Sequence, residues 1–266
     1  RHMSWLHCMW GVGTTVGPYV MEYALTGGQG WNAGYRYIAI LQFAITLVVF
    51  LSLPLWKKRA AQTRTADAAA DVGRALSLKE IARTPGAKDV MVAFFCYCAV
   101  EQTTMLWASS YLALGRGVGA DAAAGYASLF FIGITVGRAL NGFLTMRFSD
   151  AQMIRAGQAL VALGALLLLL PLGTGAALAG LVAIGLGCAP IYPCIIHSTP
   201  ERFGADRSQA LIGVQMASAY VGTLLMPPLF GLIAEHISIG LFPVFLLVAL
   251  AVMALMHERL VRMAKG

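Results

Sequence analysis

The sequence predicts an all-α integral membrane protein whose chain crosses the bilayer eight times. Of its 266 residues, 59% are hydrophobic and 12% are charged, whereas about 25% of the residues of a typical soluble domain are charged. Eight apolar segments are long enough to cross the roughly 30 Å hydrocarbon core as helices. We expect these spans at Ser4–Leu25, Tyr35–Leu55, Val90–Leu114, Ala122–Thr145, Met153–Leu172, Ala176–Ile196, Ala210–Ala234 and Ser238–Met256.

The distribution of basic residues supports this count and predicts the orientation. Lys and Arg accumulate in the short cytoplasmic loops of membrane proteins. If residue 1 is cytoplasmic, eight spans leave sixteen of the 19 basic residues inside, Arg36 and Arg116 outside, and Arg138 within a span. Because one miscounted helix would destroy this asymmetry, we expect a multi-pass protein of the plasma membrane with both ends in the cytoplasm. The net charge of +7 then reflects topology, and no basic patch indicates a nucleic-acid partner.

One long polar segment divides the spans into two groups. Residues 56–89 are rich in Ala, Thr, Asp and Arg and cannot build a hydrophobic core. Within them, Ser77 and Glu80 have the spacing of a capping box, which predicts a short amphipathic helix on the cytoplasmic surface; a solvated charged turn is the alternative. The segment separates two spans in residues 1–55 from six spans in residues 90–266.

The first two spans carry packing and anchoring signals. Gly13 and Gly17 stand four residues apart and are followed by Pro18. Small residues at this spacing let helix backbones approach each other closely in lipid, so we expect these residues to serve helix packing. The second span ends at Trp56, which precedes three basic residues and is typical of an anchor at the cytoplasmic interface.

The third span contains Glu101, the only carboxylate near the centre of any expected span. Tyr97, Glu101 and Thr104 share one face of a helix. An ionisable group in hydrocarbon costs roughly 2.5–3.5 kcal/mol on insertion scales and marks a polar cavity or pathway. Trp107, further along this span, is a candidate stacking face for a solute. The alternative is that Glu101 is neutral and only hydrogen-bonds a neighbouring helix.

The fourth span has an arginine in its middle. Arg138 shares a polar face with Thr135, Asn141 and Thr145. We expect Arg138 to pair with Glu101 across a cavity. The alternative is that the guanidinium extends along its aliphatic stem to the membrane interface.

The remaining spans add two candidate site residues, Tyr192 and Gln215, and a pair of prolines. In the sixth, Pro190 and Pro193 bracket Tyr192, and prolines bend a helix and free backbone carbonyls, which membrane proteins tolerate only against protein or water. Tyr192 is therefore a candidate cavity residue, with an interfacial tyrosine as the alternative. In the seventh, a buried Gln215 could hydrogen-bond a partner or a polyol. The fifth and eighth spans should be structural.

Neither cysteine chemistry nor an enzyme motif is indicated. All five cysteines lie inside expected spans without CxxC spacing, which favours buried free thiols. We expect no metal site and no cofactor. With a single central acid, no HExxH and no glycine-flanked nucleophile, the chain is not expected to be an intramembrane enzyme.

Four stretches make the chain resemble the major facilitator superfamily (MFS) of secondary transporters, most closely its fucose permease-like sugar:proton symporter branch. They are GTTVGPYV, GRALNGFLTMRFSD, CAPIYPCIIHSTPERFG and SQALIGVQMASAYVGTLLMPPLFGLIAEH. The resemblance implies an MFS-type helix bundle in which the eight spans are family helices five to twelve. Residues 1–55 would be the last two helices of the N-terminal bundle, residues 56–89 the central cytoplasmic loop, and residues 90–266 the C-terminal six-helix bundle. It further implies an N-terminally truncated chain that lacks the first four family helices, and it places the branch's proton-carrying acids on the first and fourth of them.

The family's loop signature after the eighth helix is only half kept. Gly142 and Arg147 match it, but Met146 stands where the family usually has Asp, and Ser149, Asp150 and Ala151 replace a glycine and a pair of basic residues. Gly142, Arg147 and Asp150, with Pro190, Pro193 and the first-span glycines, are the residues that we expect to act in gating or helix packing.

These observations together predict a secondary active transporter. We expect proton-coupled uptake of a small neutral polar solute, such as a sugar, by alternating access around a midplane site. The partners would be the solute, protons and the lipid bilayer, and the protein would be monomeric. A drug or metabolite antiporter and a non-transporting truncated remnant are the alternatives. The expected pathway residues are Tyr97, Glu101, Trp107, Arg138, Asn141, Tyr192 and Gln215.

Overall fold

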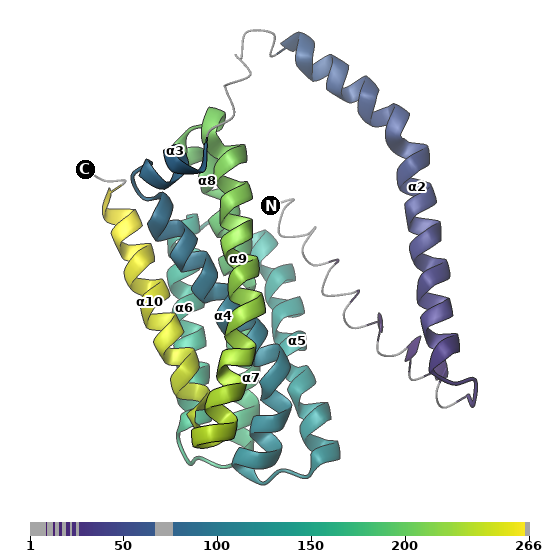
Figure 1. Cartoon of the computed structure of the whole chain (residues 1–266), viewed down its shortest axis with the longest axis vertical. Coiled ribbons are helices and arrows are strands. Elements are labelled where there is room, and N and C mark those ends of the chain that lie inside the picture. The colour runs from purple at the N-terminus through teal and green to yellow at the C-terminus, as the bar shows by residue number, and fades with distance from the viewer. Residues whose placement is uncertain are drawn as a thin grey trace. The chain divides into compact units, whose positions relative to one another are not determined.

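The computed structural model describes residues 27–66 and 77–263, together with scattered positions between residues 9 and 24 (Figure 1). The described residues form helices and turns and contain no strand. The chain divides into two compact units, residues 12–74 and the remainder, each of which is described by itself. The expected first span and Pro18 lie largely outside the described residues. Gly13 and Gly17 are helical, and a Cβ atom added to either would meet no described atom within 4 Å, so their packing role stays a prediction.

The first unit is dominated by one long helix, α2 (Trp31–Ala66). It contains the expected second span, and its stretch Trp31–Trp56 is long and apolar enough to cross a membrane. The helix continues ten residues beyond Trp56 into the segment expected to be a loop. Residues 57–66 are mainly Ala, Lys, Arg, Gln and Thr, most of which favour helix, so the helix does not stop where the hydrophobic run ends.

The second unit is a bundle of six long helices (Figure 1). Its helices are α4 (Ala87–Ser110), α5 (Ala120–Leu144), α6 (Asp150–Leu169), α7 (Thr174–His197), α9 (Ala205–Ile233) and α10 (Phe242–Met263). Six apolar helical stretches in the described part of the chain can cross a membrane, and the last, Asp206–Met263, contains both α9 and α10. All seven spans expected after residue 30 are therefore helices, and the all-α membrane fold is confirmed.

Two short helices lie at one end of the bundle, here called the α8 end. They are α3 (Leu78–Arg83) and α8 (Thr199–Phe203) (Figure 1). The capping box predicted for α3 is present, because Ser77 N donates to Glu80 Oε2 at 2.8 Å and Glu80 N donates to Ser77 Oγ at 3.3 Å. The buried Ile81 anchors α3 beside Leu211 of α9. The charge pattern of the sequence predicts that the α8 end faces the cytoplasm.

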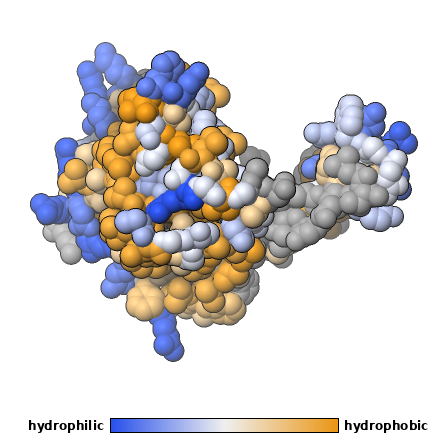
Figure 2. All heavy atoms as spheres, turned by 90° about the horizontal axis from the view of Figure 1, so that it is seen from below, coloured by the Kyte–Doolittle hydropathy of each residue, from blue (hydrophilic) through white to orange (hydrophobic). Residues whose placement is uncertain are grey.

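The outside of the bundle is apolar, as expected for contact with lipid. Figure 2 shows the bundle from the end opposite the α8 end, with hydrophobic residues forming most of a ring around a more hydrophilic centre and hydrophilic residues projecting at parts of the outer edge. Large side chains on this surface stay exposed, among them Leu224 at 72% and Leu255 at 63%. Exposed apolar surface on this scale is unusual for a soluble monomer and suits a helix bundle that is surrounded by hydrocarbon.

Helix α7 is packed against α5 and α6 through glycines. A Cβ atom on Gly133 of α5 would lie 2.6 Å from the Val182 carbonyl oxygen of α7. A Cβ atom on Gly157 of α6 would lie 2.5 Å from the Gly187 carbonyl oxygen, and the reverse contact would be 2.6 Å. Only glycine permits backbones to approach this closely, and packing of this kind drives helix association in lipid. Thus α7 forms the centre of one half of the bundle, while α4 packs against α9 and α10.

The end opposite α8 is held together by Tyr111 and Arg116. Helix α4 ends in a π-helical turn, Tyr111–Gly115. Tyr111 Oη donates to the Leu168 carbonyl at 2.5 Å, and Arg116 Nη2 donates to the Leu168 carbonyl and to the Leu170 carbonyl, the latter at 2.7 Å. The last carbonyls of a helix lack partners within the helix. Arg116 therefore caps α6 and fixes the α4–α5 loop to it.

The described cysteines are buried free thiols, as the sequence predicts. They are Cys96, Cys98, Cys188 and Cys194. Cys8 lies outside the described residues.

Replacing Arg116 by Ala should destabilise the bundle, because the carbonyls at the end of α6 would lose a charged donor. We expect a loss of about 1–3 kcal/mol in the free energy of unfolding. Thermal unfolding of the purified protein in detergent measures it, with Arg83→Ala on the exposed face of α3 as the matched control. Equal unfolding temperatures for the two variants would contradict the capping role.

Candidate functional site

A buried ion pair joins α4 to α5 in the interior of the bundle. Arg138 Nη2 lies 3.2 Å from Glu101 Oε1, and the two side chains are 5% and 8% exposed. This is the pairing that the sequence predicts. The arginine does not extend to the membrane interface, because the residue is only 4% exposed in the bundle.

Pairing offsets the energetic cost that either charge would have if it were buried alone. A lone charge in a low-dielectric interior is strongly disfavoured, and truncating one partner of a buried pair typically costs about 3–5 kcal/mol. Glu101 stands on a polar face of α4 with Tyr97 and Thr104, which are 1% and 0% exposed. The Thr104 hydroxyl donates to the Val100 carbonyl of its own helix at 2.8 Å, so it is not available to Glu101.

Two tyrosines adjoin the ion pair. The Tyr97 ring stacks on Phe94 with centroids 6.1 Å apart, and the Tyr192 ring of α7 meets Phe94 edge-on at 5.0 Å. The Tyr97 and Tyr192 centroids are 6.3 Å apart. Tyr97 stands one helical turn before Glu101 on the same face of α4. We call Glu101, Arg138, Tyr97 and Tyr192 the Glu101–Arg138 site.

Tyr192 links this site to α9. Its hydroxyl donates to the Met216 sulfur at 3.2 Å. The side chain is half-buried. The site therefore draws on α4, α5 and α7 and is in contact with a fourth helix.

Gln215 does not join the site. It is fully buried, and its amide bonds the Thr199 hydroxyl of α8 at 3.2 Å. Three residues later, Ser218 Oγ donates to the Met91 carbonyl of α4 at 3.0 Å. Met91 precedes Glu101 by ten residues, which is about 15 Å along a helix. Gln215 thus lies toward the α8 end, where it holds α8 against α9.

Trp107 also has a packing partner instead of an open face. Its indole N–H donates to the Pro227 carbonyl of α9 at 3.0 Å, and its ring meets Phe230 edge-on at 5.4 Å. Gly231 lies so close that an added Cβ atom would be 2.9 Å from the indole ring. In this conformation Trp107 fixes α4 to α9, and its expected stacking against a solute stays a prediction.

The two prolines of α7 do not break the helix. Helix α7 runs from Thr174 to His197 with Pro190 and Pro193 inside it. Because proline has no N–H, the Leu186 and Ala189 carbonyls lack their usual helical donors. Gly137 of α5 faces this region, since an added Cβ atom would lie 3.2 Å from the Leu186 oxygen. The freed backbone is covered by a neighbouring helix. Contact with protein is one of the two environments, protein or water, in which such backbone is tolerated.

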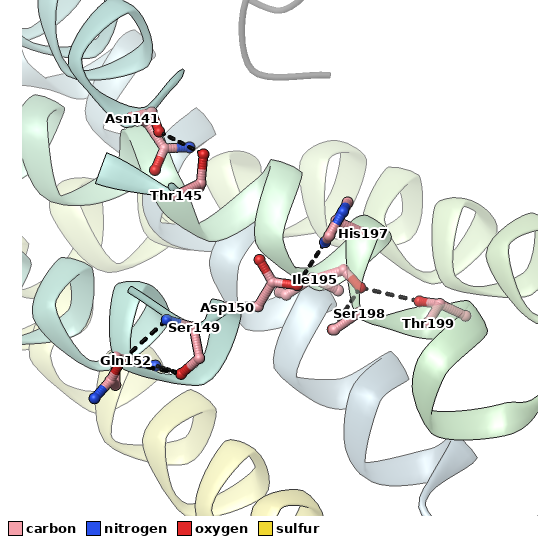
Figure 3. Close-up of polar contacts among 9 residues, drawn as sticks. All are labelled: Asn141, Thr145, Ser149, Asp150, Gln152, Ile195, His197, Ser198 and Thr199. Carbon is pink, nitrogen blue, oxygen red and sulfur yellow. Dashed lines mark hydrogen bonds and ion pairs between the residues drawn. The ribbon is translucent and has the colours of Figure 1, made fainter. Parts of the chain in front are cut away.

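A second polar cluster lies at the α8 end, around the turn between α5 and α6 (Figure 3). Asp150, the first residue of α6, pairs with His197 at the end of α7, with Oδ2 and Nδ1 2.7 Å apart. Ser149 caps α6, because its N–H donates to Gln152 Oε1 at 3.0 Å and its Oγ accepts from Gln152 N at 3.4 Å. Hydrophobicity and local spacing did not predict the Asp150–His197 pair.

The other expected gating residues flank this cluster. Gly142 is buried, and its carbonyl accepts from the Thr145 hydroxyl at 3.4 Å. Arg147 is exposed in the turn. Asn141 is 1% exposed, stands one helical turn from Arg138 toward the α8 end, and accepts from the Thr145 hydroxyl through its carbonyl at 2.9 Å (Figure 3). Their participation in gating or in the pathway stays a prediction.

Two further ion pairs hold α10 in place at the α8 end. Arg155 of α6 binds Glu258 through two bonds of 2.6 and 2.8 Å, and Arg259 lies 3.3 Å from Asp89 of α4.

Within residues 27–66 and 77–263, no group of three His, Cys, Asp or Glu side chains could hold a metal ion.

The comparison with known proteins concerns the bundle. The family model described as Major Facilitator Superfamily matches residues 90–263, which begin in α4 and end with α10. A sequence search against curated proteins finds no match.

Solved transporter structures share the fold. A crystal structure of the MFS transporter FucP in the outward conformation aligns with a TM-score of 0.61 and 19% identity, over 71% of this chain and 46% of that chain. A crystal structure of the E. coli fucose:proton symporter FucP gives a TM-score of 0.59 and 19% identity, over 71% and 47%. A peptide transporter POT structure in complex with sulfate gives 0.56 and 19% identity, over 65% and 38%. The chain thus spans less than half the length of each.

Removing one member of the ion pair should cost more stability than removing both. Arg138→Met leaves the Glu101 carboxylate without its cation, and we expect a loss of about 3–5 kcal/mol in unfolding free energy. A double variant that adds Glu101→Leu should recover much of this loss, because it buries no charge. Chemical denaturation in detergent micelles measures the difference.

Arg155→Met is the matched control for this prediction. Its side chain and that of its partner Glu258 are 45% and 39% exposed, so loss of this ion pair should change stability by at most about 1 kcal/mol. Additive losses at Glu101 and Arg138 would contradict the interpretation of the two charges as one unit.

Proposed function

The chain belongs to the Major Facilitator Superfamily, and from this we propose that it works as a proton-coupled secondary transporter for a small neutral polar solute such as a sugar. Transport would proceed by alternating access, with two bundles moving around a site near the membrane midplane. The six helices α4 to α10 would supply one bundle. Because the chain spans less than half of FucP, the other wall of the site would come from an N-terminal bundle.

The observation that carries the proposal is the Glu101–Arg138 pair. Both charges are buried in the interior of the bundle, and their guanidinium and carboxylate atoms are 3.2 Å apart. Charged groups at membrane depth are costly and commonly mark ion or substrate pathways. The pair is also adjacent to the two tyrosines, so charge and aromatic surface are available together.

The pair offers a simple way to couple a proton to a solute. While Glu101 is ionised, it attracts the Arg138 guanidinium. When Glu101 gains a proton, this attraction is lost, and the N–H groups of Arg138 become available to hydroxyl oxygens of a solute. Proton binding at Glu101 and solute binding at Arg138 would therefore favour each other, which is the linkage that symport requires.

The chemistry of the site favours a neutral, hydroxylated solute. The charges of Glu101 and Arg138 cancel, so the ionised pair has no net attraction for a cation or an anion. Tyr97 and Tyr192 add apolar ring faces beside polar groups, the mixed lining that small-molecule sites commonly have. Two of the similar structures are of the FucP transporter, and one of them is described as a fucose:proton symporter. This likeness is consistent with a neutral, hydroxylated solute.

Glu101→Gln should abolish proton-driven uptake, because the amide keeps the shape of the side chain but cannot exchange a proton. We expect uptake at the background level with unchanged abundance in the membrane. The measurement is solute accumulation in vesicles under an inward proton gradient, across a panel of sugars and polyols. Glu201→Gln, on the exposed surface of α8, is the matched control and should transport normally. Uptake by Glu101→Gln at the wild-type level would contradict the assignment.

The same vesicles separate symport from the antiporter alternative. A symporter accumulates the solute when the proton gradient is directed inward. An antiporter would accumulate the solute only when a proton or counter-substrate gradient is directed outward, because outward flow of the counter-ion or counter-substrate drives the solute inward. The second result would exclude proton-coupled uptake while leaving the family and the fold unchanged.

A further inference from the structure

An apolar groove runs between α5 and α6 on the flank of the bundle, away from the Glu101–Arg138 site. It encloses a volume of about 330 Å³, with α7 as its floor. The residues that form its walls and floor are mainly aliphatic or aromatic. Those used below are Leu140, Leu144, Phe148, Ala156, Leu160 and Leu186.

The groove exists because two consecutive helices pack against a third. Helices α5 and α6 both pack extensively on α7, through the close glycine contacts at Gly133 and Gly157. The space between α5 and α6 is left open on the outer side. Leu140, Leu144 and Leu160 line it and remain 51%, 42% and 38% exposed. In a membrane protein, exposed aliphatic surface of this kind suits contact with hydrocarbon.

The size and lining of the groove fit a single acyl chain. On α6 it extends from Gln152 to Leu160, which is about 12 Å along a helix. One leaflet of the hydrocarbon core is roughly 15 Å deep, half of the total thickness. The groove is therefore narrow, apolar and nearly as long as one leaflet is deep. A polar solute would find only Asn141 and Gln152 as polar partners along it.

The α8 end of the groove offers a place for an anionic head group. Arg147 is exposed in the α5–α6 turn, next to the lining residue Phe148, and it has no ion-pair partner among the described residues. The other charges nearby are already paired, Asp150 with His197 and Arg155 with Glu258.

Gln152 adds a neutral donor at the same end. Its amide oxygen accepts from Ser149, while its amide nitrogen points away from these contacts (Figure 3). The charge pattern of the sequence predicts that this end is cytoplasmic, and the cytoplasmic leaflet carries the anionic lipids. Positive charge and anionic lipid would therefore meet at the same depth.

We propose that the groove binds one acyl chain of an anionic phospholipid from the cytoplasmic leaflet, with its phosphate at Arg147 and Gln152. The groove supplies shape through α5, α6 and α7, and the turn supplies charge. The lipid fills the space that the glycine contacts of α7 leave open.

Photo-crosslinking tests the acyl chain. The chain, expressed with any sequence that precedes residue 1 in its gene, is reconstituted with phosphatidylglycerol that carries a diazirine on one acyl chain. Mass spectrometry then maps the labelled peptides. We expect labelling to concentrate on residues 140–160. Ala156→Phe fills the groove and should reduce this labelling about tenfold. Ala159→Phe, at an exposed position of the same helix outside the groove, should not.

Several outcomes would overturn the acyl-chain site. They are uniform labelling of all lipid-facing helices, equal labelling of the Ala156→Phe and Ala159→Phe variants, and no labelling of the groove in the complete chain, which would mean that a protein segment covers it. If Ala156→Phe does not fold, Ala156→Leu, a smaller obstruction at the same position, takes its place.

Competition between lipids tests the head group. Unlabelled phosphatidylglycerol should compete with the crosslinker about tenfold better than phosphatidylcholine. Arg147→Gln should remove this preference, whereas Arg83→Gln, an exposed arginine at the same end of the bundle, should keep it. Equal competition by the two lipids in the wild-type protein, or an unchanged preference in Arg147→Gln, would overturn the assignment of the head group to Arg147.

Discussion

Two opposite charges that are buried together inside the bundle constrain how the surrounding helices pack. Glu101 and Arg138 tolerate hydrocarbon only as a pair, so α4 and α5 must hold their atoms about one hydrogen-bond length apart. The aromatic rings of Phe94, Tyr97 and Tyr192 pack against one another beside the pair. A change of protonation at Glu101 would remove the ion-pair attraction between α4 and α5, which is the change that the proposed transport cycle uses.

Helix α7 connects this pair with the two other features of the bundle. Its glycines bring it close to α5 and α6, its Tyr192 ring lies 6.3 Å from the Tyr97 ring beside the ion pair, and its last residue, His197, binds Asp150 at the start of α6. The same close packing leaves α5 and α6 apart on their outer side, where the apolar groove lies. Movement of α7 would thus change the contacts at the Glu101–Arg138 site, at the α8 end and in the groove.

The sequence predicts those parts of the structure that depend on local patterns. Hydrophobic length predicted seven described spans, and helical spacing placed Glu101 and Arg138 in facing stripes. Contacts between distant residues were less accessible. The indole of Trp107 binds a carbonyl 120 residues away, and Asp150 binds a histidine 47 residues away. Gln215 was grouped with the site because it is polar and buried, but burial alone does not give depth in the membrane, and its partner is Thr199.

The central claim is that Glu101 gains and loses a proton as the solute binds. Infrared difference spectroscopy of the reconstituted protein, recorded with and without solute, follows the carboxyl stretching band directly. We expect a protonated-carboxyl band that changes on solute binding, shifts in heavy water and is absent in Glu101→Gln. A solute-induced carboxyl band that persists unchanged in Glu101→Gln, or no such band in a protein that transports, would contradict it.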